Sequence, residues 1–279
     1  MATQSAIWPA RLHHIRINSP EPDRLATFYG EALGYEVTDL GGNLFRLSGP
    51  DRRLLIGPGG KQTLGFAAFD LATTDRLAHY HAHLTARGLS LESSPSPMLA
   101  GEAFSVRDPD GNALVFGLAE PGPAPQGLPG RLQHVVVQSA APEPIAAFYE
   151  HDLGFVLSDW VRDDAGAPMA GFLRSDPEHH SFAVFHASGS RLDHHAYETT
   201  CWNDIRDWAD HLARLRVALW WGPGRHGPGD NLFFMIEDPD GNKIELSAEQ
   251  ELMPIDMAPR EWPANARTLN LWGTAWIRE

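Results

Sequence analysis

Apolar and polar positions along the chain predict a strand followed by a helix in one well-marked segment. Residues 135–137 are three consecutive valines, a β-branched run suited to a buried strand. Residues 139–143 then supply a capping serine and a proline-rich helix entry. Beyond this entry, apolar side chains recur at helical spacing, at Ile145, Phe148, Tyr149 and Leu153.

A tight turn and a further strand are predicted near residue 240. Residues 238–241 read Asp-Pro-Asp-Gly, in which proline presets one backbone dihedral and glycine accepts positive φ. The strand that follows, 243–246, places Ile244 and Leu246 on one face and Glu245 on the other. Glu245 is therefore expected to point into the concave side of a sheet.

Internal repetition organises the whole chain. LHHIRINS (12–19) returns as LQHVVVQS (132–139), and ATFY (26–29) returns as AAFY (146–149). DPDGN occurs in both halves, and each half carries a similar strand-to-helix step near its middle, LATTDRLA and TCWNDIRDWA. We therefore predict an α+β protein of four βαβββ modules, paired into two domains that each form a cupped mixed sheet with flanking helices.

Domain boundaries follow from composition. The Pro/Gly-rich segment 121–130 is expected to link the halves. An N-terminal domain without metal is assigned to residues 1–125, and a C-terminal catalytic, metal-binding domain to 126–250. Residues 251–279 form an extension rich in Pro and Trp, without clear periodicity.

Composition narrows the class of partner. With 43% hydrophobic and 21% charged residues, the 279-residue chain is expected to fold throughout. Its net charge of -14 argues against nucleic acid, which requires clustered Lys and Arg. No apolar run suits a membrane span and no leader pattern opens the chain, so a cytoplasmic location is expected.

Histidine and carboxylate are the available metal ligands. The single cysteine, Cys201, excludes an internal disulfide and a thiolate-rich site, whereas there are 14 histidines. His134, His195 and Glu245 stand at equivalent early-strand and late-strand module positions, from which side chains can converge inside the cup. Two imidazoles and one carboxylate leave metal positions open, as in non-heme Fe(II) oxygenases.

The first half provides an internal comparison for this site. Its matching positions are His14, Phe66 and Val115, so only one residue of a ligating type is retained. The N-terminal domain is therefore expected to serve as a structural partner without a metal of its own.

These motifs resemble those of the type I extradiol dioxygenases of the vicinal oxygen chelate superfamily, over residues 10–248. The resemblance implies His134, His195 and Glu245 as iron ligands. It assigns His180, in EHHS, to the acid/base position, and His226, in GPGRHG, to a substrate hydrogen bond. GPGRHG together with DPDGNKIE is closest to the homoprotocatechuate 2,3-dioxygenase branch.

Two departures from the family pattern concern the substrate. The family usually has a Tyr nine residues after this histidine, where the chain has Met235. The homoprotocatechuate enzymes have an Arg before GPGRH, and here Trp221 replaces it. A thioether cannot donate a hydrogen bond, and an indole has no positive charge with which to form an ion pair with a carboxylate. These substitutions favour a neutral or larger aromatic catechol.

The function implied is extradiol cleavage of an aromatic diol by O2 on Fe(II), or on Mn(II), which the same ligands accept, giving a muconic semialdehyde-type product. A homo-oligomer is expected. One alternative is a non-oxygenase isomerase, lyase or resistance protein of the same superfamily that uses its metal as a Lewis acid. Another is a module that binds an aromatic compound without turnover. The first alternative does not account for His180 together with His226, and the second could be supported by the Trp-rich second half.

Overall fold

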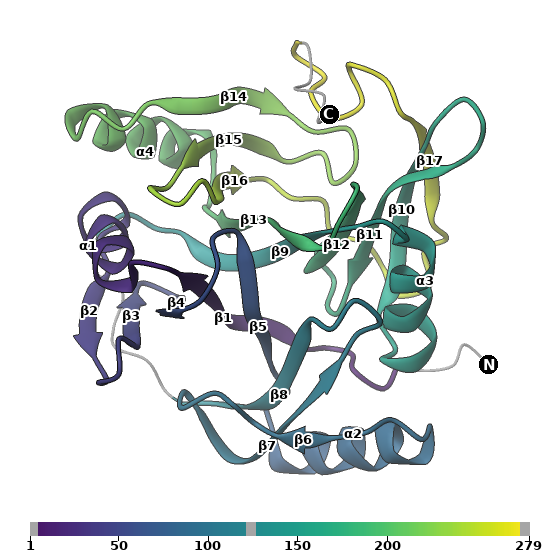
Figure 1. Cartoon of the computed structure of the whole chain (residues 1–279). Helices are drawn as coiled ribbons and strands as arrows, with labels where there is room; N and C mark the ends of the chain where they lie inside the picture. Colours follow the sequence, from purple (N-terminus) through teal and green to yellow (C-terminus); the bar gives the residue numbers. More distant parts are fainter. Residues whose placement is uncertain (1–4, 121–126, 274–279) are drawn as a thin grey trace.

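The computed structural model describes residues 5–120 and 127–273, which form two mixed sheets (Figure 1). The first half begins with β1 (Arg11–Ser19), α1 (Pro22–Leu33), β2 (Glu36–Asp39), β3 (Phe45–Gly49) and β4 (Arg52–Pro58). The same order follows in β5 (Thr63–Asp70), α2 (Thr74–Ala86), β6 (Glu92–Ser93), β7 (Leu99–Arg107) and β8 (Ala113–Ala119).

The second half repeats this plan and adds a strand from the C-terminal extension. Its third module is β9 (Arg131–Ser139), α3 (Pro142–Ala147) with the π-helical turn η1 (Phe148–Asp152), β10 (Val156–Arg162), β11 (Pro168–Arg174) and β12 (Phe182–His186). The fourth is β13 (Arg191–Glu198), α4 (Trp202–Arg214), β14 (Leu219–Arg225), β15 (Leu232–Glu237) and β16 (Lys243–Ala248), and β17 (Arg260–Pro263) comes last. The predicted fold of four βαβββ modules is confirmed.

Each sheet joins two modules through their first strands. The first sheet runs β2-β3-β4-β1-β5-β8-β7-β6, and the second runs β14-β15-β16-β13-β9-β12-β11-β10-β17. The central pairs β1–β5 and β9–β13 are antiparallel, and β17 lies parallel to β10 at the sheet edge. Of the predicted linker, residues 121–126 lie outside the described part of the chain.

Irregular pairing at the centre of both sheets shapes the site. Between β9 and β13 the register passes over Gln133 and Asp193, so each is an extra residue on its strand. Between β1 and β5 it passes over His13 and Gly65 in the same way. A bulge interrupts the strict alternation of faces and re-aims the side chains beside it. The side chains on these central strands therefore cannot be assigned to a face by counting in twos.

Helix α1 shows how local sequence and tertiary packing agree. Pro22 occupies the first turn, where its missing N–H costs nothing, and Gly34 ends the helix in the left-handed conformation at φ 66°. One face of the helix is buried, including Leu25 and Tyr29. Among the described residues, no helix is both long and apolar enough to cross a membrane.

The two halves brace each other through their repeated motifs. Tyr29, on α1, donates a hydrogen bond of 3.0 Å to Asp238 in the second-half DPDGN turn. Tyr149, on η1, donates one of 3.5 Å to Asp108 in the first-half turn. All four side chains are buried. The repeated tyrosine and the repeated turn are therefore the two sides of a reciprocal contact between the halves.

Replacement of Tyr29 by phenylalanine is expected to lower the free energy of unfolding by about 1–3 kcal/mol. The substitution removes a hydrogen bond from a buried carboxylate while keeping the ring, and such groups are costly to leave under-satisfied. Urea denaturation measures the change. Tyr149→Phe is the matched control, and its longer bond predicts a smaller loss. A Tyr29→Phe protein as stable as wild type would show that the contact contributes little.

Candidate metal centre

A row of side chains crosses five neighbouring strands on one face of the second sheet. Trp221 on β14 pairs with Met235 on β15, and Met235 pairs with Glu245 on β16. Glu245 pairs with Ala196 on β13, and Ala196 pairs with His134 on β9. Directly paired residues point to the same side of a sheet. Ala196, which has a small side chain, stands between Glu245 and His134 in this row.

Three residues on this face bring possible metal-binding atoms together. His134, His194 and Glu245 each offer one, and these atoms all lie within 4.8 Å of one another. His194 lies on β13 two residues before Ala196, so the two share a face. The structure does not bring His195 into this group, which corrects the sequence-based choice of His195 to its neighbour His194.

His195 lies on the opposite face of β13 and faces the first half of the chain. Its Nε2 is 3.3 Å from the hydroxyl of Tyr29, and the two rings are stacked with centroids 5.9 Å apart. The same register also refines the comparison between halves. Phe66 pairs with Arg16, and His194 pairs with Val136. Arg16 and Val136 occupy the same position in the repeated first strand, so Phe66 is the counterpart of His194.

The bulged residues hold the two imidazoles in place. The amide oxygen of Gln133 contacts Nδ1 of His134, and a carboxylate oxygen of Asp193 lies 2.6 Å from Nδ1 of His194. With both Nδ1 atoms engaged, Nε2 is the nitrogen that each ring can offer to a metal. Metal-binding histidines characteristically donate their other N–H to such a partner. This donor set fits a divalent cation. Each bulge places the side chain that holds the ring, Gln133 or Asp193, immediately before its histidine.

The protonation states also suit a metal. Burial lowers the pKa of His134 to about 3, so its ring is neutral at pH 7. Burial opposes ionisation of Glu245, but the nearby histidines, His226 foremost, lower the pKa of its carboxyl group to about 2. Asn231 also donates a hydrogen bond of 3.1 Å to Glu245. The neutral ring of His134 and the ionised carboxylate of Glu245 thus offer a lone pair and a negative charge to a divalent cation.

Both further histidines predicted from the sequence lie against this group. The ring of His180 is 4.3 Å from that of His134, centroid to centroid, and burial holds the pKa of His180 well below 6.5. Nε2 of His226 lies 3.5 Å from a carboxylate oxygen of Glu245. The ring of His226 is stacked on Phe233 at 3.8 Å, which fixes its plane.

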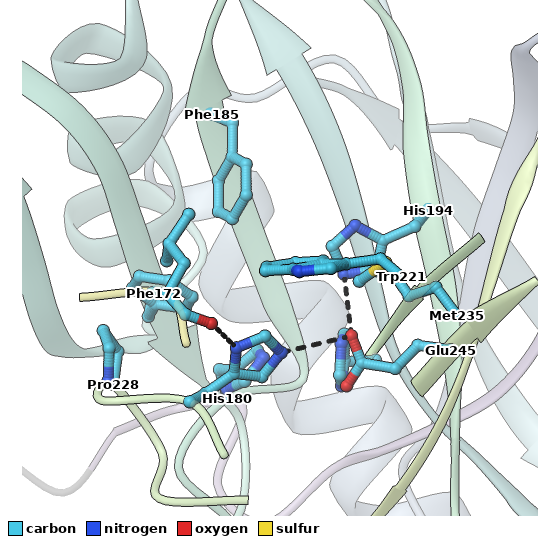
Figure 2. A pocket seen from close by; sticks show the side chains of 11 residues that line it. Phe172, His180, Phe185, His194, Trp221, Pro228, Met235 and Glu245 are labelled. Carbon is cyan, nitrogen blue, oxygen red and sulfur yellow. Dashed lines mark hydrogen bonds and ion pairs between the residues drawn. The ribbon is translucent and has the colours of Figure 1, made fainter. Parts of the chain in front are cut away.

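The three candidate ligands line a cavity whose other walls are mostly apolar. Figure 2 shows Phe172 and Pro228 on one side and Met235 and Glu245 on the other. The predicted residues His134, His180, Trp221, His226, Met235 and Glu245 all line it. The structure adds five residues that the sequence did not identify: Phe172, Phe185, His194, Pro228 and Leu269.

The C-terminal extension completes the cavity wall. Leu269 lines it, and the Leu269 carbonyl lies 2.5 Å from Nδ1 of His226. A Cβ atom on Gly224 would meet Asn270, and one on Gly227 would meet the Thr268 carbonyl. The glycines of GPGRHG therefore permit the extension to pack directly on this loop. Residues 268–270 belong to the site although they follow the repeated modules.

The corresponding region of the first half is filled by apolar side chains. Phe66 and Val115 belong to a buried cluster completed by Leu55, Ala68, Met98 and Ala113. His14 occupies the position of His134, and its Nε2 lies 2.7 Å from the hydroxyl of Ser96. Nε2 of His14 thus has a hydrogen-bond partner, whereas the ring of His134 faces a cavity.

Some of the missed residues left a signal in the sequence. Aligning FAAFD (66–70) with HHAYE (194–198) places Phe66 opposite His194, and this register identifies the correct histidine. The alternating apolar positions of β11 and β12 are compatible with Phe172 and Phe185 sharing the sheet face. Leu269 follows a segment without periodicity, so no sequence pattern indicates its place.

Comparison with known protein families agrees with the duplicated fold. The model of the family described as Glyoxalase/Bleomycin resistance protein/Dioxygenase superfamily matches residues 11–116 and again residues 131–246. The two matches correspond to the two sheets. The extension, including β17 and Leu269, lies beyond both.

Several relatives are dioxygenases by name. A manganese-dependent 2,3-dihydroxybiphenyl 1,2-dioxygenase of Geobacillus genomosp. 3 is 24% identical over 282 residues, covering 91% of this chain and 90% of the relative. An iron-dependent extradiol dioxygenase of Rhodococcus jostii is 28% identical, covering 79% and 81%. A Brevibacterium fuscum homoprotocatechuate 2,3-dioxygenase structure, with 3,4-dihydroxyphenylacetate, has a TM-score of 0.81 at 22% identity, covering 98% and 93%. The predicted resemblance is confirmed.

Proposed function

Because this chain belongs to the Glyoxalase/Bleomycin resistance protein/Dioxygenase superfamily, we propose that it is an Fe(II)-dependent extradiol dioxygenase that cleaves the ring of a catechol with O2. The observation that carries the proposal is the convergence of His134, His194 and Glu245 beneath a cavity lined by His180 and His226. The relatives named as dioxygenases, one of them an iron-dependent extradiol dioxygenase, support the reaction class. A cytoplasmic location, a homo-oligomeric state and the domain limits at residues 125 and 250 stay predictions.

His134, His194 and Glu245 would hold the metal. When bound, Fe(II) supplies a Lewis acid for the catechol oxygens and a path for electrons from the ring to O2. Iron-dependent and manganese-dependent relatives both occur, and the donor set accepts either ion. We assign Fe(II), because two histidines and one carboxylate are the ligand types of non-heme Fe(II) oxygenases.

The surrounding side chains supply proton transfer and charge stabilisation. His180 accepts a proton from a catechol hydroxyl, holds it within the buried cavity and returns it to an oxygen atom later in turnover. Nδ1 of His226 donates to the Leu269 carbonyl, and Nε2 lies near Glu245. In its protonated form, the ring stabilises through Nε2 the negative charge that develops on the substrate. Phe172, Phe185 and Leu269 restrict access of water to the reacting groups.

The natural substrate, on this proposal, is a catechol with a neutral apolar substituent. Apart from the histidines and Glu245, the cavity-lining residues within the described part of the chain are apolar or aromatic, and neither Lys nor Arg is among them. A substrate carboxylate would lose its hydration there without gaining a cationic partner, which is costly. Trp221, paired with Met235 beside Glu245, offers an aromatic surface instead.

An oxygen electrode tests the reaction and the substrate class together. Anaerobically purified protein loaded with Fe(II) should consume one O2 per catechol and form a yellow product. We expect kcat/KM for 2,3-dihydroxybiphenyl to exceed that for 3,4-dihydroxyphenylacetate by at least about tenfold, corresponding to about 1.4 kcal/mol.

Trp221→Arg is the matched variant for the substrate assignment. A guanidinium at this place should narrow or reverse the preference by pairing with the substrate carboxylate. Absence of oxygen uptake across a broad catechol panel would exclude the oxygenase. Oxygen uptake with a preference for the carboxylate substrate in the wild type would retain the reaction and exclude only the substrate class.

A further inference from the structure

A buried pair of side chains stands directly behind His180, on the side away from the cavity. Nδ1 of His179 lies 2.9 Å from Nδ1 of His180. Nε2 of His179 lies 2.9 Å from Oδ2 of Asp159 on β10, and the side chains of both His179 and Asp159 are fully buried. The proposed acid/base is thus the first member of a continuous chain, His180, His179 and Asp159.

Asp159 is fixed in its ionised form by the C-terminal extension. Arg260 on β17 donates to both carboxylate oxygens, through Nε at 2.9 Å and Nη2 at 3.0 Å. The indole of Trp262 donates to Oδ2 at 2.8 Å. Burial opposes the charge, but the hydrogen bonds from His179 and Arg260 outweigh it, so the pKa of Asp159 is lowered. The carboxylate therefore accepts hydrogen bonds and donates none.

This carboxylate determines where the protons lie on both rings. Nε2 of His179 faces Asp159 and must carry a hydrogen, while burial lowers the pKa of His179 and keeps its ring neutral. In a neutral imidazole the second nitrogen is an acceptor. Nδ1 of His179 therefore accepts, and Nδ1 of His180 donates. His180 then directs the lone pair of Nε2 toward the cavity.

Gln250 is the remaining neighbour of the same nitrogen. Its Nε2 lies 2.9 Å from Nδ1 of His180, and its Oε1 has no hydrogen-bond partner among the described residues. A half-turn of this amide exchanges the two atoms. The rotated amide would place Oε1 beside the N–H of His180 as a second acceptor and would give up the 3.4 Å hydrogen bond from Nε2 to the His180 carbonyl. This orientation agrees with the proton positions set by Asp159.

We propose that His179 and Asp159 are positioning residues that hold His180 in the tautomer protonated on Nδ1, so that its Nε2 is ready to accept a proton from the catechol. The inference rests on the proposed function for the role of His180. One proton passes from the catechol hydroxyl to Nε2, the His180 ring becomes an imidazolium, and its Nδ1–H continues to donate to His179. Neither His179 nor Asp159 gains or loses a proton.

The test replaces Asp159 by asparagine and reads the tautomer directly. An amide can donate to Nε2 of His179, which would move the hydrogen of His179 to Nδ1 and that of His180 to Nε2. Long-range 15N–1H NMR of histidine-labelled protein, loaded with diamagnetic Zn(II), distinguishes protonated from unprotonated ring nitrogens. Wild-type His180 should be protonated on Nδ1, and Asp159→Asn should be protonated on Nε2.

Kinetics of the iron-loaded proteins provide a second measurement. Asp159→Asn should lower kcat about 100-fold or more, the range of general-base catalysis, with the catechol KM changed by less than about threefold. Trp262→Phe removes another hydrogen bond to the same oxygen, Oδ2, without changing its charge. This control should keep the wild-type tautomer and a kcat within about threefold.

The spectrum of the wild-type protein alone can overturn the proposal. A His180 ring protonated on Nε2 would do so whether or not Asp159→Asn folds, and so would an Asp159→Asn protein with unchanged tautomer and kcat. The tautomer is read without turnover. A failure of dioxygenase activity would therefore overturn the proposed function, while the NMR spectrum would still decide whether His179 and Asp159 set the tautomer of His180.

Discussion

Replacement of His194 by alanine is expected to abolish metal binding and ring cleavage. The substitution removes one of three candidate ligands whose binding atoms lie within 4.8 Å of one another. Metal affinity should fall by more than about 100-fold, because even the loss of a hydrogen-bonding partner behind a ligand costs about 10–100-fold. Metal content after gel filtration and oxygen uptake with a catechol measure the two effects.

His195→Gln is the matched control for this variant. His195 is the adjacent residue on the same strand, equally buried, yet it contacts Tyr29 on the opposite face. We expect this protein to retain its metal and its oxygen uptake, with a loss confined to the free energy of unfolding. Metal retained by His194→Ala and lost by His195→Gln would restore the sequence-based assignment and contradict the geometry.

Replacement of His180 by phenylalanine should keep the metal and slow turnover. Phenylalanine preserves an aromatic ring against His134 but cannot accept or donate a proton. General acid/base assistance contributes about 100 to 10,000-fold, so kcat should fall by a factor in this range. The measurements are metal content and oxygen uptake at saturating catechol.

His186→Phe controls for the loss of a histidine near the same strand. His186 ends β12 and is exposed, so its substitution should leave metal content and kcat unchanged. A His180→Phe protein with wild-type kcat would exclude His180 as the proton acceptor, while one without metal would show that its main role is to support His134.

Strand alternation and internal repetition suffice to predict much of this protein. The repeats indicate the four modules, because a duplicated sequence with the same apolar pattern folds into the same unit. Alternation separates Glu245 from Ile244 and Leu246 and so assigns it to the sheet face that carries the cavity, since β16 pairs without interruption with β15. The motifs likewise place five further residues around one site: His134, His180, His226, Trp221 and Met235.

The choice between His194 and His195 depends on the pairing of the strands. Two adjacent histidines on a strand point to opposite faces, so a slip of one position exchanges the ligand for a side chain at the contact between halves. The bulges at Gln133 and Asp193 make this register unreadable by counting, because each adds a residue to one strand without a partner. Pairing with the neighbouring strands fixes it.

The amino-acid sequence specifies the modules, the ligand types and most of the motifs around the site, whereas the packing of the sheets specifies which motifs meet. Tyr29 joins Asp238 across the halves, and Asp159 and Arg260 meet behind His180. Local patterns record helix and strand periodicity because neighbouring residues share one element. Contacts such as these, between residues about 100 or more positions apart, depend on how whole sheets pack, and no local spacing encodes them.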